Sequence, residues 1–158
     1  MSANDYGLPR SVQVGERELD INGYGKREIL FFDAYACALY LARPSSDASF
    51  IMSGDISTAI VVRVLANDPP DEFPDKWDEI LRQEISGRAY RRLEKAFERL
   101  STGDKIQFLY GPGQGTRVLL NDKQVVSDPG HGLMVEILDH WIGSDPVSID
   151  LASALLAR

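Results

Sequence analysis

The amino-acid sequence predicts an α+β fold with a large, mostly antiparallel sheet. Residues 12–66 and 105–126 carry the alternation and the β-branched and aromatic side chains that are typical of strands. In residues 70–100 and 133–156, apolar side chains recur every three or four positions, as on one face of a helix. Blocks of strands followed by blocks of helices favour an α+β fold over a doubly wound parallel sheet. A chain of 158 residues has the usual length of one domain, so we expect a single domain over residues 1–158.

The first block predicts a hairpin followed by one long strand. Apolar and polar residues alternate in 12–14 and 19–21, and Asn22-Gly23 is the strongest short hairpin signal in the sequence. We expect the chain to turn there and to enter a strand over residues 27–41, which is apolar on both faces and therefore covered on both sides. Because side chains alternate along a strand, one face carries Phe31, Asp33, Tyr35, Cys37 and Leu39. The other face is rich in alanine, which leaves room for a helix or a ligand.

The later elements follow in order along the chain. Residues 43–47 stop the long strand and offer an N-cap for a short helix over 48–52, and residues 57–66 form a second β-branched strand. The helical period between Pro70 and Leu100 predicts two helices, or one helix bent at Gly87. Further strands are expected at 105–110, 116–120 and 124–126, and further helices at 133–142 and 148–156.

Composition excludes several classes of function. The net charge of −7 argues against nucleic acid or an anionic membrane surface as the main partner, because both select for basic patches. Cys37 is the single cysteine, so an intramolecular disulfide is impossible, and its apolar neighbours suit a small core residue. The apolar runs are too short for a membrane span, and the first ten residues lack the pattern of a signal peptide.

Few motifs point to catalysis or to a cofactor. The glycine-rich segment 111–115 lacks the lysine and hydroxyl residue of a phosphate loop, and it precedes a strand. His131 and His140 have no partner at metal-ligand spacing, so we expect no metal, and no cofactor is implied. The sequence also lacks a nucleophile elbow. We therefore assign no catalytic residue.

A set of polar side chains beside apolar walls instead suits a molecule with one acidic end. Arg27 at the start of the long strand offers a planar fork for a carboxylate, although a strand-edge ion pair is an equal alternative. Asp33 is a site candidate because a buried charge needs a partner, and the alternative is a position near solvent at a bulge or a pair with an arginine. Tyr35 is a further candidate for this binding site, and Tyr110 is either another candidate or an aromatic side chain that packs on the sheet.

Three separated stretches resemble one family: GYGKREILFFDAYACALYLARPSSD, GDKIQFLYGPGQGTRVLLNDKQV and LDHWIGSDPVSIDLASALL. Together they are similar to the bacterial chalcone isomerase-like proteins. The resemblance implies the open-faced β-sandwich of chalcone isomerases, in which helices cover one face of a large antiparallel sheet and a ligand cleft lies between them. Because bacterial members often carry an export signal, it also implies a periplasmic location.

The resemblance assigns roles to two residues. In the plant enzymes an arginine at the start of the long strand stabilises the phenolate and enolate of the flavonoid, and Arg27 looks like its counterpart. The plant threonine within the strand lines up with Tyr35, and the plant tyrosine and asparagine near the first long helix have no clear counterparts, so the isomerase set is mostly absent. In the fatty-acid-binding relatives an arginine and a tyrosine hold the carboxylate, and Arg27 and Tyr35 suit those two roles.

Three hypotheses about function remain. The first is non-enzymatic binding of a fatty acid or a similar small amphiphilic acid, with Arg27 and Tyr35 on the carboxylate and Trp77 or Phe32 as an apolar wall. The second is an isomerase, or intramolecular lyase, in which Arg27 stabilises an enolate. The third is a protein-interaction module with an occluded pocket, in which the sheet edge recruits a partner.

Overall fold

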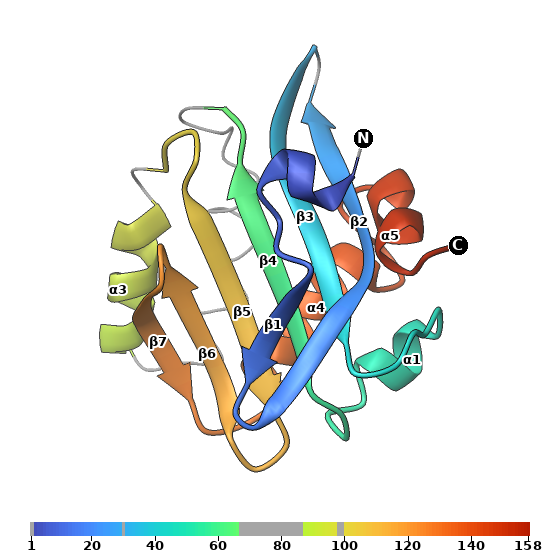
Figure 1. The fold of residues 1–158 in the computed structure, drawn as a ribbon. Coiled ribbons are helices and arrows are strands. Elements are labelled where there is room, and N and C mark those ends of the chain that lie inside the picture. Colours follow the sequence, from blue (N-terminus) through green and yellow to red (C-terminus); the bar gives the residue numbers. More distant parts are fainter. Residues whose placement is uncertain (1, 30, 67–86, 98–99) are drawn as a thin grey trace.

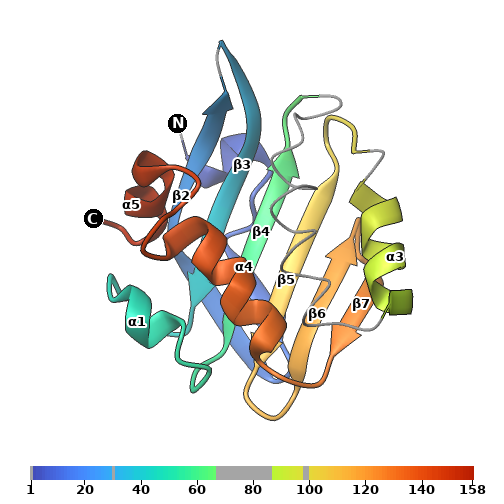
Figure 2. The same cartoon turned by 180° about the vertical axis from the view of Figure 1, so that it is seen from behind.

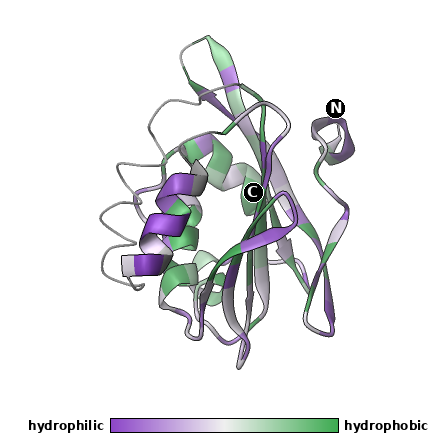
Figure 3. Cartoon of the chain, turned by 90° about the vertical axis from the view of Figure 1, so that its left-hand side faces the viewer, coloured by the Kyte–Doolittle hydropathy of each residue, from purple (hydrophilic) through white to green (hydrophobic). Residues whose placement is uncertain are grey.

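A computed structural model gives the fold and describes residues 2–29, 31–66, 87–97 and 100–158. Its strands form one antiparallel sheet in which every strand pairs with the next one along the chain (Figure 1). The sheet curls strongly when it is viewed from the side (Figure 3). The predicted α+β fold with a large antiparallel sheet is confirmed. The strands are β1 (Ser11–Val14), β2 (Arg17–Ile29), β3 (Phe32–Leu41), β4 (Thr58–Val64), β5 (Lys105–Gly111), β6 (Gly115–Leu120) and β7 (Lys123–Asp128).

Helices cover one face of this sheet. Helix α4 (Gly132–Ile142) crosses the middle strands, α5 (Ile149–Leu155) lies along β2, and α3 (Gly87–Phe97) lies beside β7 (Figure 2). A short helix, α1 (Ala48–Ile51), follows β3, and a 3-10 turn, η1 (Ala3–Tyr6), precedes β1. The main core fills the space between the sheet and the helices and includes the fully buried Trp141 of α4. No helix in the described part of the chain is long and apolar enough to cross a membrane.

The opposite face of the sheet carries a second core. Strand β1 and the first half of β2 fold back over β3, β4 and β5, and bring Val14 and Leu19 against the small side chains of Ala36 and Ala38 (Figure 1). Strand β3 is therefore buried on both faces, as its continuous apolar sequence predicts. The space that the alanines leave is filled by this hairpin, and not by a helix or a ligand.

The turn predicted at Asn22-Gly23 is wrong. The first hairpin turns at Gly15-Glu16, where Val14 pairs with Arg17 and Gly15 adopts a φ of +60°. Asn22 lies inside β2 at a register shift, and its side chain holds three backbone groups: its Nδ2 donates to the carbonyls of Ser45 and Leu155, and its Oδ1 accepts from the amide of Ser45. An Asn-Gly pair that suits a turn is used here to attach α5 to the sheet.

The predicted long strand is also divided in two. Strand β2 ends at Ile29 and β3 begins at Phe32, and these two residues pair across a second hairpin. The apolar residues at this tip predicted a continuous strand because a run of apolar residues usually indicates a buried strand. At this tip, however, Phe31 is fully exposed and Phe32 is 40% exposed.

The predicted elements at 48–52, 57–66, 105–126 and 133–156 are confirmed, with ends that differ by at most two residues. Helix α1 begins after Asp47, whose side chain accepts from the amide of Phe50 at 3.2 Å, and α5 begins after Ser148, which accepts from Leu151. Helix α3, Gly87–Phe97, is the described part of the predicted helical region. The helical prediction for residues 70–86, with Trp77, lies outside the described residues.

Candidate functional site

The cavity that contains Arg27 lies between β2 and α5 and has a volume of about 400 Å³. Two glycines allow the helix to approach the strand this closely. A Cβ on Gly23 would clash with the carbonyl oxygen of Ala154, and one on Gly25 would come within 3.1 Å of both Leu151 and Ala154. The alternation of β2 then presents Arg27 at the cavity. The cavity is lined by Gly25, Lys26, Arg27 and Glu28 from β2, by Ser148 just before α5, and by Asp150, Leu151 and Ala154 from α5.

The charges around this cavity come in both signs. The Arg27 side chain is partly buried, and its Nη1 donates to the carbonyl of Glu28 at 2.8 Å. The Lys26 Nζ lies 3.3 Å from an oxygen of Asp33 and 3.3 Å from one of Glu28. Hydrogen bonds to Asp33 and then to Glu28 raise the pKa of Lys26, so Lys26 stays cationic at neutral pH. The charge of Lys26 is thus matched by carboxylates beside it.

Tyr35 lies directly opposite Arg27 on the neighbouring strand, on the face that the helices cover. It is 1% exposed, and its hydroxyl accepts a hydrogen bond from Trp141 Nε1 at 2.9 Å. The two rings meet edge to face, with centroids 6.3 Å apart. Tyr35 therefore belongs to the packed core behind the cavity, one strand away from Arg27.

Asp33 does not share a face with Tyr35, so the predicted alternation fails at this point. Ala34 has no partner in β2, because Arg27 pairs with Tyr35 while Glu28 pairs with Asp33. This extra residue is a β-bulge, and it turns both Ala34 and Tyr35 toward the helices. Asp33 points to the other face, where its side chain is 43% exposed and contacts Lys26.

Tyr110 lies at the far end of the sheet from Arg27. It pairs with Thr58, which pairs with Leu41, so it is displaced from Tyr35 by about 20 Å along the strands. Its hydroxyl donates to the carbonyl of Gly54 at 2.7 Å, and its ring lies 4.8 Å from that of His131. Burial, and then the charge of Asp55, raises the pKa of Tyr110. The structure thus brings Arg27 and Tyr35 together and leaves Tyr110 apart; Trp77 lies outside the described residues.

The wall that α5 contributes to the cavity was not predicted from the sequence. The signal that could have indicated it is the Gly23-x-Gly25 spacing inside a strand, because glycine in a strand often marks the close approach of another backbone. Trp141, the partner of Tyr35, was predicted only as one residue of an apolar helical stripe.

The sequence and the fold can be compared with known proteins. A family model described as chalcone isomerase-like matches residues 1–157. The chain belongs to the chalcone isomerase-like family. Among solved structures, this chalcone isomerase-like protein is similar to the crystal structure of a fatty-acid binding protein from Arabidopsis thaliana. The match has a TM-score of 0.64 and 18% sequence identity, and it covers 94% of this chain and 90% of the other. At this identity the likeness shows a shared fold. No curated protein matches the sequence.

The described residues of this chalcone isomerase-like protein include no group of three or more His, Cys, Asp or Glu side chains that could hold a metal ion. Cys37 is fully buried, and burial raises the pKa of its thiol well above the usual range. A thiol in this position stays protonated and inaccessible. The charged residues that line the cavity are the cations Lys26 and Arg27 and the anions Glu28 and Asp150.

Proposed function

We propose that this protein binds a fatty acid or a similar small amphiphilic acid without converting it, with Arg27 holding the carboxylate. The observation that carries the proposal is the position of Arg27, partly buried at a cavity of about 400 Å³ that has Leu151 and Ala154 in its wall. Small-molecule sites commonly have volumes of about 300–1,000 Å³. A guanidinium group can donate two parallel hydrogen bonds to a carboxylate, which a lysine cannot do.

The neighbouring residues support an acidic ligand with an apolar part. The apolar side chains of α5 offer contact to the first carbons of a chain, whereas the ammonium group of Lys26 is engaged by Asp33 and Glu28. Tyr35 is the proposed second donor. Because it is 1% exposed, a carboxylate on Arg27 reaches its hydroxyl only if the ligand enters between the sheet and the helices.

The similar solved structure supports the same class of ligand, since that plant protein is described as a fatty-acid binding protein. Catalysis has weaker support. The resemblance implies a counterpart of the plant isomerases' arginine in Arg27, but it implies no clear counterpart of the tyrosine and asparagine that accompany it.

The experiment that tests this proposal is native mass spectrometry of the purified protein, followed by organic extraction and a fluorescence titration with palmitic acid. We expect a small acid to travel with the protein, and Arg27→Ala to weaken the affinity at least tenfold. Arg17→Ala is the matched control, because Arg17 is exposed at the other end of β2. An unchanged affinity in Arg27→Ala would remove Arg27 from the proposed site.

Two other results would change the function itself. Turnover of a chalcone that depends on Arg27 would favour the isomerase hypothesis. A protein that carries no acid and ignores added palmitic acid would favour the interaction module with an occluded pocket.

A further inference from the structure

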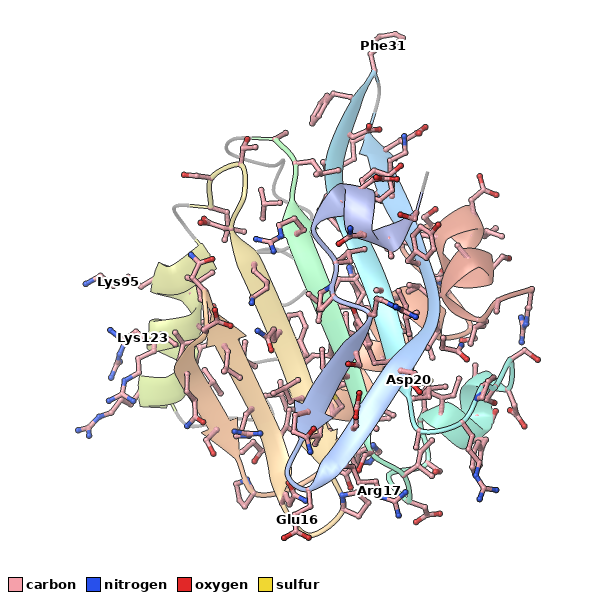
Figure 4. The ribbon with its side chains drawn as sticks, in the orientation of Figure 1. Glu16, Arg17, Asp20, Phe31, Lys95 and Lys123 are labelled. Carbon is pink, nitrogen blue, oxygen red and sulfur yellow. The ribbon has the colours of Figure 1, made fainter. Side chains whose placement is uncertain are left out.

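The tip of the β2–β3 hairpin is the most exposed apolar feature in the described part of the chain. Phe31 is fully exposed, and the adjacent Phe32 is 40% exposed. Figure 4 shows Phe31 at the outermost end of the hairpin, pointing away from the rest of the molecule. Figure 3 shows the tip as hydrophobic, with a hydrophilic stretch behind it. Hairpin turns usually carry glycine, asparagine or other polar residues, so two adjacent phenylalanines at a projecting tip are not explained by turn geometry or by packing.

We propose that this tip, Phe31 and Phe32, inserts into the surface of a zwitterionic lipid layer. Aromatic side chains that project from a polar surface are suited to the boundary between headgroups and acyl chains. This inference goes beyond the proposed ligand site, because it concerns where the protein would meet a lipid layer and not what it holds.

The charges behind the tip favour a zwitterionic surface. Residues 26–33 contain two cations and two anions, and the pairs of Lys26 with Glu28 and Asp33 hold opposite charges next to each other. The whole chain has a net charge of −7, which opposes approach to an anionic layer. Arg27 lies about 10 Å behind Phe32 along the strands, so a tip inserted by about 5–10 Å would place the charged pairs at the level of the headgroups.

The size of the tip favours lipid over a protein partner. A stable protein interface buries about 800 Å² on each side, whereas one aromatic side chain buries about 150–250 Å². Two phenylalanines on a narrow ribbon therefore fall well short of a protein interface. A lipid layer has no such requirement, since apolar side chains can enter it one at a time.

The location of the tip also connects it to the ligand cavity. Both lie on the same hairpin, because β2 supplies four of the cavity-lining residues just before the tip. An amphiphilic acid that leaves the lipid layer would meet Arg27 within about 10 Å of the surface.

The test is flotation of the purified full-length protein with phosphatidylcholine vesicles in a sucrose gradient, at low and at high salt. We expect the protein to float with the vesicles at both salt concentrations, and Phe31→Asp to lower the bound fraction at a given lipid concentration at least tenfold. Phe50→Asp is the matched control, because Phe50 is 49% exposed on α1 and lies away from the hairpin. It should float like the parent protein. Near-ultraviolet circular dichroism checks that both variants remain folded.

Several outcomes would overturn the inference. The parent protein could fail to float, or Phe31→Asp could float as well as the parent protein. Phe31→Asp and Phe50→Asp could lose the same fraction of vesicle binding. The parent protein could also bind only phosphatidylglycerol vesicles and lose that binding at high salt. The first outcome, together with a Phe31-dependent self-association or complex, would assign the tip to a protein partner. Failure of this inference differs from failure of the proposed function, because Arg27→Ala should still float and Phe31→Asp should still bind palmitic acid.

Discussion

Tyr35 shows how a residue chosen as a ligand donor also serves the core. Its hydroxyl accepts the only hydrogen bond that the indole of Trp141 can donate through nitrogen, and both side chains are at most 1% exposed. A buried N–H group without an acceptor destabilises the folded state by the full free energy of its desolvation. The hydroxyl of Tyr35 is therefore needed for stability whether or not it contacts a ligand.

We expect Tyr35→Phe to lower the free energy of unfolding by about 1–3 kcal/mol, because it leaves Trp141 Nε1 without its acceptor in the core. Urea denaturation followed by tryptophan fluorescence measures this change. Tyr90→Phe is the matched control: its hydroxyl bonds Glu94 at the surface, so its effect should be within about 0.5 kcal/mol. Equal effects of the two substitutions would contradict the structural role of Tyr35.

His131 is a second residue whose environment has a measurable consequence. Its Nε2 is buried and makes no hydrogen bond in the described structure, and burial lowers the pKa of His131 although Asp55 acts in the opposite direction. The unfolded chain therefore takes up a proton more readily than the folded chain. Stability that is present above the ordinary histidine pKa of about 6.5 is lost as the pH falls through the lower folded value.

We expect the free energy of unfolding to decrease between pH 7 and pH 5, and His131→Gln to reduce the slope of this decrease. Urea denaturation at a series of pH values measures both curves. The difference between the two curves isolates His131, since every other titratable side chain is present in both proteins. An identical slope in the variant would mean that the pKa of His131 is not lowered by folding.

At the scale of elements, the attachment of α5 to β2 decides the shape of the candidate site. Gly23 and Gly25 allow the helix to approach, and Asn22 ties the end of the helix and the loop after β3 to the strand. The cavity forms because α5 packs against β2 without covering Arg27.

We expect Gly23→Ala to lower the free energy of unfolding by about 1–3 kcal/mol or more, because the new Cβ meets the backbone carbonyl of Ala154, which cannot rotate away. Gly130→Ala is the control, since no atom lies within 4 Å of a Cβ at that position. Urea denaturation compares the two variants. A Gly23→Ala protein as stable as the Gly130→Ala protein would show that α5 can shift at little cost.

At the scale of the whole molecule, the curled sheet separates two hydrophobic cores, one on each of its faces. One face packs against the helices and the other against the N-terminal hairpin, so β3 has no exposed face until it reaches the β2–β3 tip. The cavity with Arg27 and the exposed phenylalanines lie on this one hairpin, whereas Tyr110 and His131 lie at the opposite end of the strands. The two proposals therefore concern the same end of the molecule and can be tested by separate variants.

Local patterns in the sequence were sufficient for the fold class and for most elements. The apolar run within residues 27–41 predicted a strand buried on both faces, which holds for residues 34–41, and the helical stripe of residues 133–142 predicted α4. These predictions succeed because burial and backbone periodicity act on neighbouring residues, and the sequence displays both directly. The same holds for the N-cap of α1, because the side chain of Asp47 accepts from an amide only three positions away.

Tertiary contacts decided the rest. Asn22-Gly23 has the local chemistry of a turn, but bonds to Ser45 and Leu155, far along the chain, hold it inside a strand. The bulge at Ala34 depends on pairing with β2 and on the amides of residues 65 and 66, and it alone moves Asp33 away from Tyr35. The sequence by itself determined that Arg27 would precede a strand buried on both faces, because that depends on residues next to it. Only the tertiary structure placed Arg27 at a cavity with α5, because a site is formed by segments whose separation along the chain leaves no local pattern.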